Sequence, residues 1–183
     1  MIEQFKQIVV GQIEAGLSML AECIHRCPPE HWDAPVAKYP FWQVAYHTLC
    51  FVDVYLSPSD SAWQPQTTGP GGGLHPRGRA ELEAEYPSRR FDRSELLDYV
   101  TLCRRKLHDA LAAETAESLS GASGFAYRRF SRAELHLYNL RHLQHHAGQL
   151  TALLHRIGLG TRWAQSGWQC DRVAGDPARE PAA

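Results

Sequence analysis

The chain has 183 residues, of which 44% are hydrophobic and 21% charged, and its formal net charge is −1. This composition is typical of an ordinary globular protein and excludes a disordered or fibrous chain. The near-zero net charge excludes broad electrostatic attraction to nucleic acid or to an anionic membrane surface. The length suits one domain with a single substantial core.

The amino-terminal stretch MIEQFKQIVVGQIEAG has no basic segment followed by a purely apolar run, so we expect no secretory signal. No apolar run approaches the roughly 18–20 residues that a membrane span requires. The five cysteines are odd in number and scattered, which indicates neither a disulfide framework nor a zinc knuckle. We therefore expect a reduced, cytoplasmic protein without a membrane-spanning segment.

Four segments carry the three-to-four-residue periodicity of amphipathic helices. The first covers Ile2 to Ile24 and stops at CPPEHW. The second opens at YPFWQVAYHTLCFVDVYL, where Pro40 suits a first helical turn. The third runs from about Ser94, which we expect to be its N-cap, through Leu111.

The fourth segment begins at SRAE, where Ser131 and Glu134 have the spacing of a capping box, and ends near Gly158. Its expected inward stripe consists of Leu135, Tyr138, His142, His146, Gln149 and Leu153. No segment alternates like a strand. The sequence therefore predicts an all-α four-helix bundle.

A connection of more than thirty residues, 57–93, separates the second helix from the third. Such a length is typical of a crossover, a lid or a partly disordered loop, and it allows the two helices to lie parallel. Its segment RAELEAEY suits one or two short helical turns. We expect residues 1–160 to form the bundle domain and residues 161–183 a partly disordered tail, in which Trp163 and Trp168 pack and about the last ten residues do not.

The fourth helix contains His142 and His146, which are four residues apart and point the same way one turn apart. Imidazoles at this spacing can bind one divalent ion through nitrogens at about 2.0–2.1 Å. The pair alone is weak evidence, because the chain has ten histidines and a buried histidine is commonly a hydrogen-bonded core residue.

Two observations favour a metal site over core histidines. The pair lies on the stripe that we expect to face the interior, where unsatisfied imidazole nitrogens are costly. A third histidine, His47, lies on the inward stripe of the second helix, and facing helices of a bundle can bring it to the same point. Three neutral imidazoles leave a position open, which is typical of a catalytic site rather than a closed structural one.

The stretch FWQVAYHTL around His47, the long connection, and HLQHHAGQL near the end of the fourth helix together resemble the DinB/YfiT-like superfamily of four-helix-bundle metalloproteins, over most of residues 1–158. The resemblance implies a divalent metal ion, such as zinc or nickel, held by His47, His142 and His146. His145 points about 100° away from His146 on the helix and suits packing or a surface contact instead.

The same resemblance implies a chemistry. Members of the superfamily include thiol transferases and isomerases that use low-molecular-weight thiols, and others are regarded as metal-dependent hydrolases. We therefore expect a metal-activated thiol or water that attacks an electrophilic small molecule. Many members are homodimers, so the resemblance also implies a homodimer.

The sequence indicates no catalytic residue. The fourth helix reads HLQHH, so the glutamate of an H-E-x-x-H metalloprotease is absent, and Asp53 lies roughly 240° around the second helix from His47. Gln43, Asn139 and Gln149 lie one turn from a histidine and can orient imidazoles or a ligand, although ordinary helix-to-helix hydrogen bonds explain them equally well.

Cys50 follows His47 by three residues and is a competing nucleophile, but a small buried core cysteine is the favoured interpretation. The basic clusters SRRFDR, CRRK and YRRF are short and lie in separate segments. We interpret them as solvated charges rather than as a nucleic-acid groove.

Two functional hypotheses follow. The first is a metal-dependent transferase or hydrolase that acts on a small molecule with a low-molecular-weight thiol or water. The second is a non-catalytic, structural or stress-related homodimer in which the ion ties the second and fourth helices together. An open cavity beside three ligands favours the enzyme, whereas four protein ligands without a cavity favour the structural protein. A third reading, histidines hydrogen-bonded in the core without metal, stays open.

Overall fold

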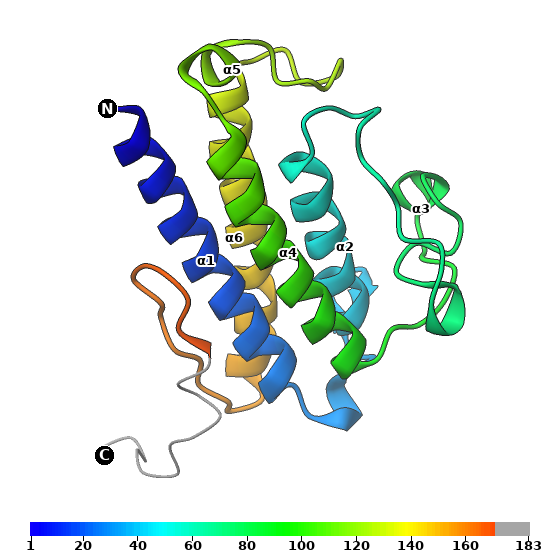
Figure 1. The fold of residues 1–183 in the computed structure, drawn as a ribbon. Helices are drawn as coiled ribbons and strands as arrows, with labels where there is room; N and C mark the ends of the chain where they lie inside the picture. Colours follow the sequence, from blue (N-terminus) through cyan, green and yellow to red (C-terminus); the bar gives the residue numbers. More distant parts are fainter. Residues whose placement is uncertain (171–183) are drawn as a thin grey trace.

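The computed structural model describes residues 1–170. Four long helices run side by side, with α1 and α6 pointing one way and α2 and α4 the other (Figure 1). α4 and α6 each pack against both α1 and α2. This arrangement confirms the predicted all-α bundle, whose long helices are α1 (Ile2–Arg26), α2 (Phe41–Leu56), α4 (Arg93–Ala113) and α6 (Arg132–Arg156).

The connection between α2 and α4 lies on the outside of α2 (Figure 1). Within it are a 3-10 turn, Pro70–Gly72, and one helical turn, α3 (Ala80–Glu83), as the RAELEAEY segment predicts. We refer to residues 57–92 as the insert. The insert returns the chain to the end of the bundle at which α2 begins, so α2 and α4 lie parallel, as its length allows.

The helix ends follow local capping chemistry. The Asp92 side chain accepts the Glu95 N–H at 2.9 Å, and the Glu95 side chain accepts the Asp92 N–H at 2.9 Å. The expectation that Ser94 caps α4 is therefore wrong, because only Asp92 has a glutamate at the third helical position and so forms the reciprocal box. The predicted N-cap Ser131 is confirmed by its acceptance of the Glu134 N–H at 3.2 Å.

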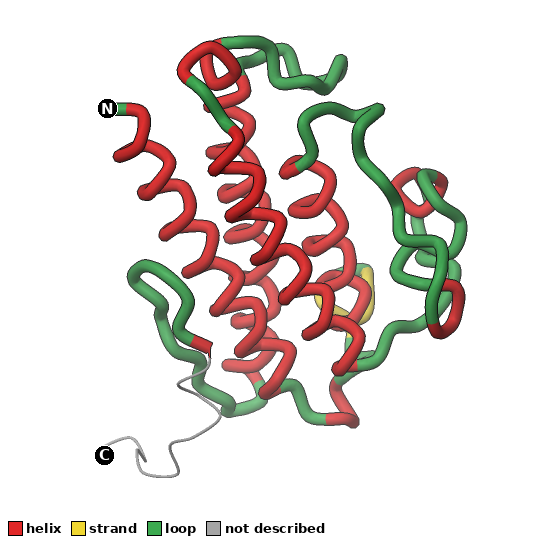
Figure 2. The backbone as a smooth tube through the Cα atoms, in the orientation of Figure 1, coloured by secondary structure: helices red, strands yellow, loops and turns green. Residues whose placement is uncertain are grey.

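The structure contains short elements that the sequence pattern does not predict, among them the helix α5 (Ala116–Ser120) and a small antiparallel hairpin before α2. Its strands are β1 (Pro35–Val36) and β2 (Tyr39–Pro40), drawn in yellow behind α2 in Figure 2. Ala37 turns the chain with a φ of +56°, a conformation that is uncommon outside glycine. Two residues per strand are too few for an alternating pattern to show in the sequence.

Helix α1 supplies much of the core. By length and composition it could cross a membrane, but 72% of its apolar window is buried inside the molecule. Ile13, Leu17, Leu20 and Ile24 are fully buried against the other helices. A helix that buries its apolar surface against its neighbours in this way is a core helix of the bundle.

The segment after α6 folds back along α1. The Gly167 N–H donates to the Gly11 carbonyl at 2.8 Å, and the Arg104 guanidinium lies 3.8 Å from the centre of the Trp168 ring. The expected packing is thus confirmed for Trp168 and wrong for Trp163, which is 72% exposed, because its neighbour Ala164 is the residue buried here. The disorder expected for about the last ten residues of the tail falls within residues 171–183, which lie outside the described residues.

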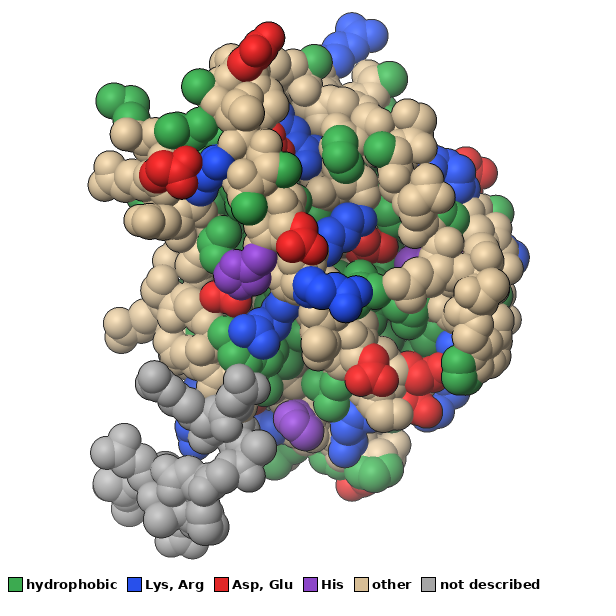
Figure 3. Space-filling model, viewed as in Figure 1, with side chains coloured by type: hydrophobic (Ala, Val, Ile, Leu, Met, Phe, Trp, Pro, Cys, Tyr) green, Lys and Arg blue, Asp and Glu red, His purple; other side chains and the backbone are tan. Residues whose placement is uncertain are grey.

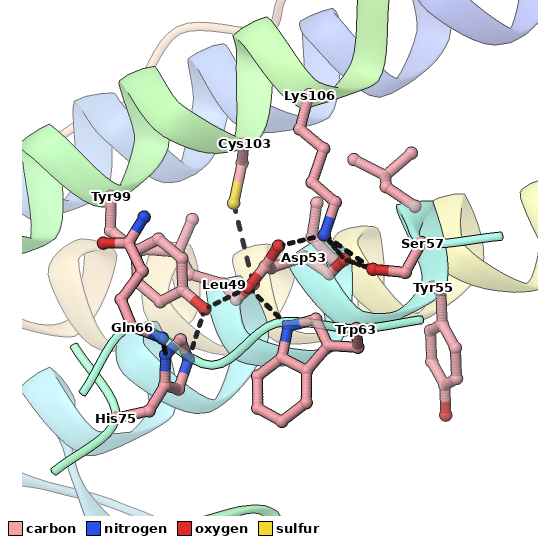
Figure 4. Close-up of polar contacts among 12 residues, drawn as sticks. Leu49, Asp53, Tyr55, Ser57, Trp63, Gln66, His75, Tyr99, Cys103 and Lys106 are labelled. Carbon is pink, nitrogen blue, oxygen red and sulfur yellow. Dashed lines mark hydrogen bonds and ion pairs between the residues drawn. The ribbon is translucent and has the colours of Figure 1, made fainter. Parts of the chain in front are cut away.

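A buried polar network holds the insert against the bundle (Figure 4). Lys106 of α4 donates to Asp53 Oδ1 of α2 at 2.5 Å, and Trp63 of the insert donates to Asp53 Oδ2 at 2.8 Å. The Tyr99 hydroxyl donates to Asp53 Oδ2 at 3.2 Å, and the same hydroxyl lies 2.9 Å from His75 Nε2. Asp53 therefore faces away from His47, as expected. Lys106 of the CRRK cluster is only 28% exposed, which corrects its interpretation as a solvated charge.

Candidate metal centre

The structure brings together the three histidines that the sequence singles out. His47 comes from α2, and His142 and His146 come from successive turns of α6. One ring nitrogen of each lies within 4.8 Å of the others, and the Nε2 atoms of His47 and His142 are 3.3 Å apart. Two ligand nitrogens at about 2.05 Å from one tetrahedral zinc ion are about 3.3 Å apart, so the nitrogens of His47 and His142 already have the spacing of two ligands of one ion.

The position of the cluster differs from the expected inward stripe. The face of α6 that enters the core carries Leu143, Ala147 and Leu150, whereas His142 and His146 are only half-buried. The buried face of a helix is a stripe with edges, and these two histidines lie at the edge that faces α2. His47 is the exposed residue of α2 at the same edge. The cluster therefore opens outward instead of closing into the core.

Aromatic rings surround the imidazoles. The Phe51 ring centre lies 4.8 Å from that of His47 and 5.4 Å from that of His142, and Tyr55 lies 6.5 Å from His142. The exposed surface of His47 faces a pocket, so its ring is accessible to a small molecule although protein surrounds it.

Burial determines the protonation state of all three rings. It lowers the pKa of His47 to about 4 and that of His142 to about 3, and in both cases a neighbouring histidine adds to the effect. Burial also lowers the pKa of His146, although a hydrogen bond to Gln149 opposes the shift. All three imidazoles are neutral at pH 7, so their lone pairs are available to a cation.

The three amides expected to orient the histidines differ in what they contact. His146 donates through Nδ1 to Gln149 Oε1 at 2.9 Å, which leaves its Nε2 lone pair free. Gln43 instead donates to the Glu85 carbonyl at 2.8 Å, and Asn139 donates to the Val52 carbonyl at 3.4 Å. Only Gln149 holds an imidazole; the other two join α2 to the insert and to α6.

A pocket of about 360 Å³ opens beside the cluster. His47, His146 and Gln149 form part of its lining, and the insert contributes its outer wall through Leu82, Ala84 and Glu85. The insert thus covers one side of the site, a point that the sequence leaves open. The remaining lining residues are Val36, Ala37, Lys38, Tyr39, Gln43, Val44 and Phe51.

The charged residues of this pocket are not predicted by the sequence. Lys38 of the hairpin forms an ion pair with Glu85 of the insert, and the Tyr39 hydroxyl lies 3.5 Å from the same carboxylate. No local signal could identify them, because their contact joins two loops that only the folded chain brings together. Phe51, by contrast, could be identified from the sequence as a neighbour of the site, because it follows His47 by one turn of the same helix.

Cysteine does not take part in the cluster. Cys50 is buried, and burial raises its pKa to about 12, so the thiol stays protonated. Within residues 1–170 the group of potential ligands consists of the three histidines, without a cysteine or carboxylate. Three protein donors beside a pocket correspond to the open kind of site rather than to the closed one.

A helical bundle that gathers three neutral imidazoles beside a small-molecule pocket defines a class of all-α proteins with a candidate metal centre. The chain belongs to the DinB superfamily, whose model matches residues 12–150, a range that contains His47, His142 and His146. The family resemblance of the sequence is thereby confirmed. No curated protein and no solved structure matches the chain.

Proposed function

We propose that the protein is a metal-dependent enzyme of small-molecule chemistry, with one divalent ion, zinc or nickel, held by His47, His142 and His146. The observation that carries the proposal is the meeting of three neutral imidazoles with a pocket that two of them line. An ion held only by neutral ligands keeps its full charge and lowers the pKa of a thiol or water bound to it.

Other residues of the chain orient the histidines and shape the pocket. Gln149 fixes the tautomer and direction of His146. Val44, Phe51 and Leu82 give the pocket an apolar wall, which excludes water and strengthens electrostatic interactions within it. The pocket is at the small end of the range for ligand sites, which supports a small-molecule substrate.

A thiol fits this site better than water does. The carboxylate in the pocket is Glu85, whose pKa lies below its usual range because of its hydrogen bond and ion pair with Lys38. A carboxylate with a low pKa is a poor proton acceptor at neutral pH. A low-molecular-weight thiol forms its anion with less help, so we propose thiol transfer to an electrophilic small molecule, with hydrolysis as the second candidate reaction.

Two further parts of the proposal follow from the chemistry and the family. Cys23, Cys27, Cys50 and Cys103 form no disulfide bond, which suits a reducing cytoplasm. We also propose a homodimer, as in many members of the superfamily, without nucleic acid or membrane as a partner. Lys and Arg side chains are interspersed with Asp and Glu on the face shown in Figure 3, which supports this exclusion for that face.

Metal content tests the site. The protein is expressed without a polyhistidine tag, and metals are measured by mass spectrometry beside His47→Ala, His142→Ala and the matched control His145→Ala, whose side chain is exposed on the same helix. We expect about one zinc or nickel ion per chain, lost in the first two variants and kept in the control. Metal retained in His47→Ala would contradict the ligand set.

Thiol binding tests the chemistry. Cobalt(II) replaces the native ion, and a low-molecular-weight thiol is added while the thiolate-to-cobalt absorption is recorded. We expect this absorption to appear and the protein to accelerate transfer of the thiol to an electrophilic aromatic halide. An ion that binds without accepting a thiol or activating water would support the structural, non-catalytic role instead.

A further inference from the structure

We propose that the pocket beside the histidines binds a small zwitterion, with an ammonium and a carboxylate close together on a short apolar body, as in an amino acid. The inference deepens the proposed function, because it names the class of substrate for the same site. It is carried by the ion pair between Lys38 and Glu85, which lines the same pocket as His47 and His146.

The pair is placed by the fold rather than by chance contact of two long side chains. Lys38 belongs to the hairpin, and Glu85 follows α3 in the insert. The Gln43 side chain holds the Glu85 backbone by donating to its carbonyl at 2.8 Å. The Tyr39 ring lies 5.3 Å from the Lys38 ammonium, and its hydroxyl lies 3.5 Å from the Glu85 carboxylate. One cation and one anion are therefore held next to each other in the wall.

The pair can exchange its partners for a ligand. The side chain of Lys38 is 61% exposed and that of Glu85 is 52% exposed. An ion pair in contact with water contributes little stability, so its separation costs little. Each charge can then meet an opposite charge on a bound molecule without leaving the other unpaired.

Electrostatics selects among ligands by the number of their charges. A ligand with one charge is attracted by one member of the pair and repelled by the other, so its net gain is small. A zwitterion whose dipole is opposed to the pair gains from both contacts. A neutral pair of charges in the wall thus favours a zwitterion over an amine or an acid of the same length.

The rest of the pocket limits the size and polarity of the body. Its volume of about 360 Å³ lies near the lower end for ligand sites. Val44, Phe51 and Leu82 offer apolar contacts in the same lining as the charged pair and the histidines. A short aliphatic or thiol-bearing side chain fits this wall and brings its end toward His47 and His146.

The test uses three ligands that differ only in charge. Norvaline carries both charges, butylamine lacks the carboxylate, and pentanoate lacks the ammonium. Each is titrated into the isotopically labelled full chain, after removal of metal with a chelator and after zinc loading, and amide chemical shifts are followed by NMR. We expect norvaline to bind about twofold to fivefold tighter than either single-charge ligand, with shifts centred on Val36, Leu82 and Ala84.

If the pair recognises the charge of the ligand, two variants should change the affinities for the single-charge ligands in opposite ways. Lys38→Gln leaves Glu85 without its counter-charge, so the affinity for norvaline should fall and the affinity for butylamine should rise. Glu85→Gln leaves Lys38 without its counter-charge, so the affinity for norvaline should fall and the affinity for pentanoate should rise. Lys6→Gln and Glu3→Gln make the same charge changes in an ion pair on α1, outside the pocket lining, and should leave all three affinities unchanged.

The proposal is overturned if norvaline binds no better than butylamine and pentanoate, if no ligand shifts the pocket amides, or if each variant weakens all three ligands equally. That last result would mean that the pair only closes the pocket. Because the ligands carry no thiol and the apo chain is included, this outcome is independent of the metal. Metal content measured in the same variants should stay at the wild-type level, which separates a failure here from a failure of the metal site.

Discussion

At the scale of single residues, the candidate site depends on which ring nitrogen carries the proton. His146 donates through Nδ1 to Gln149, so the opposite nitrogen is the one with a lone pair. His142 has a buried Nδ1 atom without a hydrogen-bond partner among the residues that the structure describes. The orientation of His142 therefore rests on packing against rings and on its contact with His47 Nε2, and that of His146 on its hydrogen bond to Gln149.

Removal of the Gln149 side-chain amide should weaken metal binding without abolishing it. We expect Gln149→Leu to lower the affinity for zinc by about tenfold to a hundredfold, because His146 loses the partner that fixes its tautomer. Competition with a chromogenic chelator measures the affinity. Gln144→Leu, an amide on the same helix that contacts Met19, is the control. Equal affinity in both variants would show that packing alone orients His146.

The buried His75 predicts a pH dependence of stability. Burial lowers its pKa to about 4, with Lys106 adding to the effect and Asp53 and Glu81 opposing it. Between about pH 6.5 and 4 the unfolded chain binds a proton at this residue and the folded chain does not, so stability falls as the pH falls through this range. The contribution is at most about 3 kcal/mol.

Urea unfolding with a chelator present, at about pH 7 and about pH 4.5, measures this contribution. His75→Gln cannot titrate, so it should lose less stability between the two pH values than the wild type does. Other buried histidines, such as His136, titrate in both proteins and cancel in the comparison. An unchanged difference would mean that His75 does not contribute to acid sensitivity.

At the scale of elements, the insert behaves as a separate layer fastened to α2 and α4. Asp53 accepts from Lys106, Trp63 and Tyr99, and so joins both helices to the insert through one carboxylate. His75 continues this chain: its Nδ1 accepts the Gln66 N–H, which leaves Nε2 to donate to the Tyr99 hydroxyl. The insert, which also supplies the outer wall of the pocket, is therefore fastened by a network centred on another face of α2 than the one that carries His47.

Loss of the Asp53 charge should loosen the insert while the helices of the bundle stay folded. We expect Asp53→Asn to reduce the free energy of unfolding by about 2 kcal/mol, because Lys106 is left in a largely buried position without a counter-charge. Trypsin should cleave the insert faster at Arg77 and Arg79 while the bundle stays helical by circular dichroism. Asp60→Asn removes a carboxylate that is 45% exposed and should change both measurements much less. Equal proteolysis of the two variants would contradict this role.

At the scale of the whole molecule, the histidine cluster lies where two antiparallel helices meet. α2 and α6 pack against each other, and a metal ion on His47, His142 and His146 would join them directly. An ion that binds only the folded arrangement stabilises it by mass action.

Zinc should therefore raise the melting temperature. At about one hundred times its dissociation constant, zinc adds about 2.7 kcal/mol, which for a chain of this length is about 5–10 °C. Differential scanning calorimetry measures the shift, which should vanish in His47→Ala and persist in His145→Ala. A shift of the same size in His47→Ala would place the stabilising ion elsewhere.

Much of the fold could be predicted because it depends on local chemistry. The three-to-four-residue apolar spacing predicts the four long helices, and Ser131 and Gly158 mark the ends of the last one within two residues. The prediction of Ser94 as the N-cap is wrong because Asp92, two residues earlier, is followed three residues later by the glutamate that completes a capping box. The prediction that Trp163 packs is wrong because no local sequence pattern indicates which side of a loop enters the core.

The sequence by itself determined the helices, the bundle class, the family and the three histidines, because periodicity, capping and the i,i+4 spacing act within a few residues of chain. Only the tertiary structure decided that the histidines lie at an edge that opens to a pocket, that the insert closes one side of it, and that Lys38 and Glu85 meet there. Those contacts join segments far apart along the chain. Their positions depend on how helices pack and loops return, and no local pattern encodes that information.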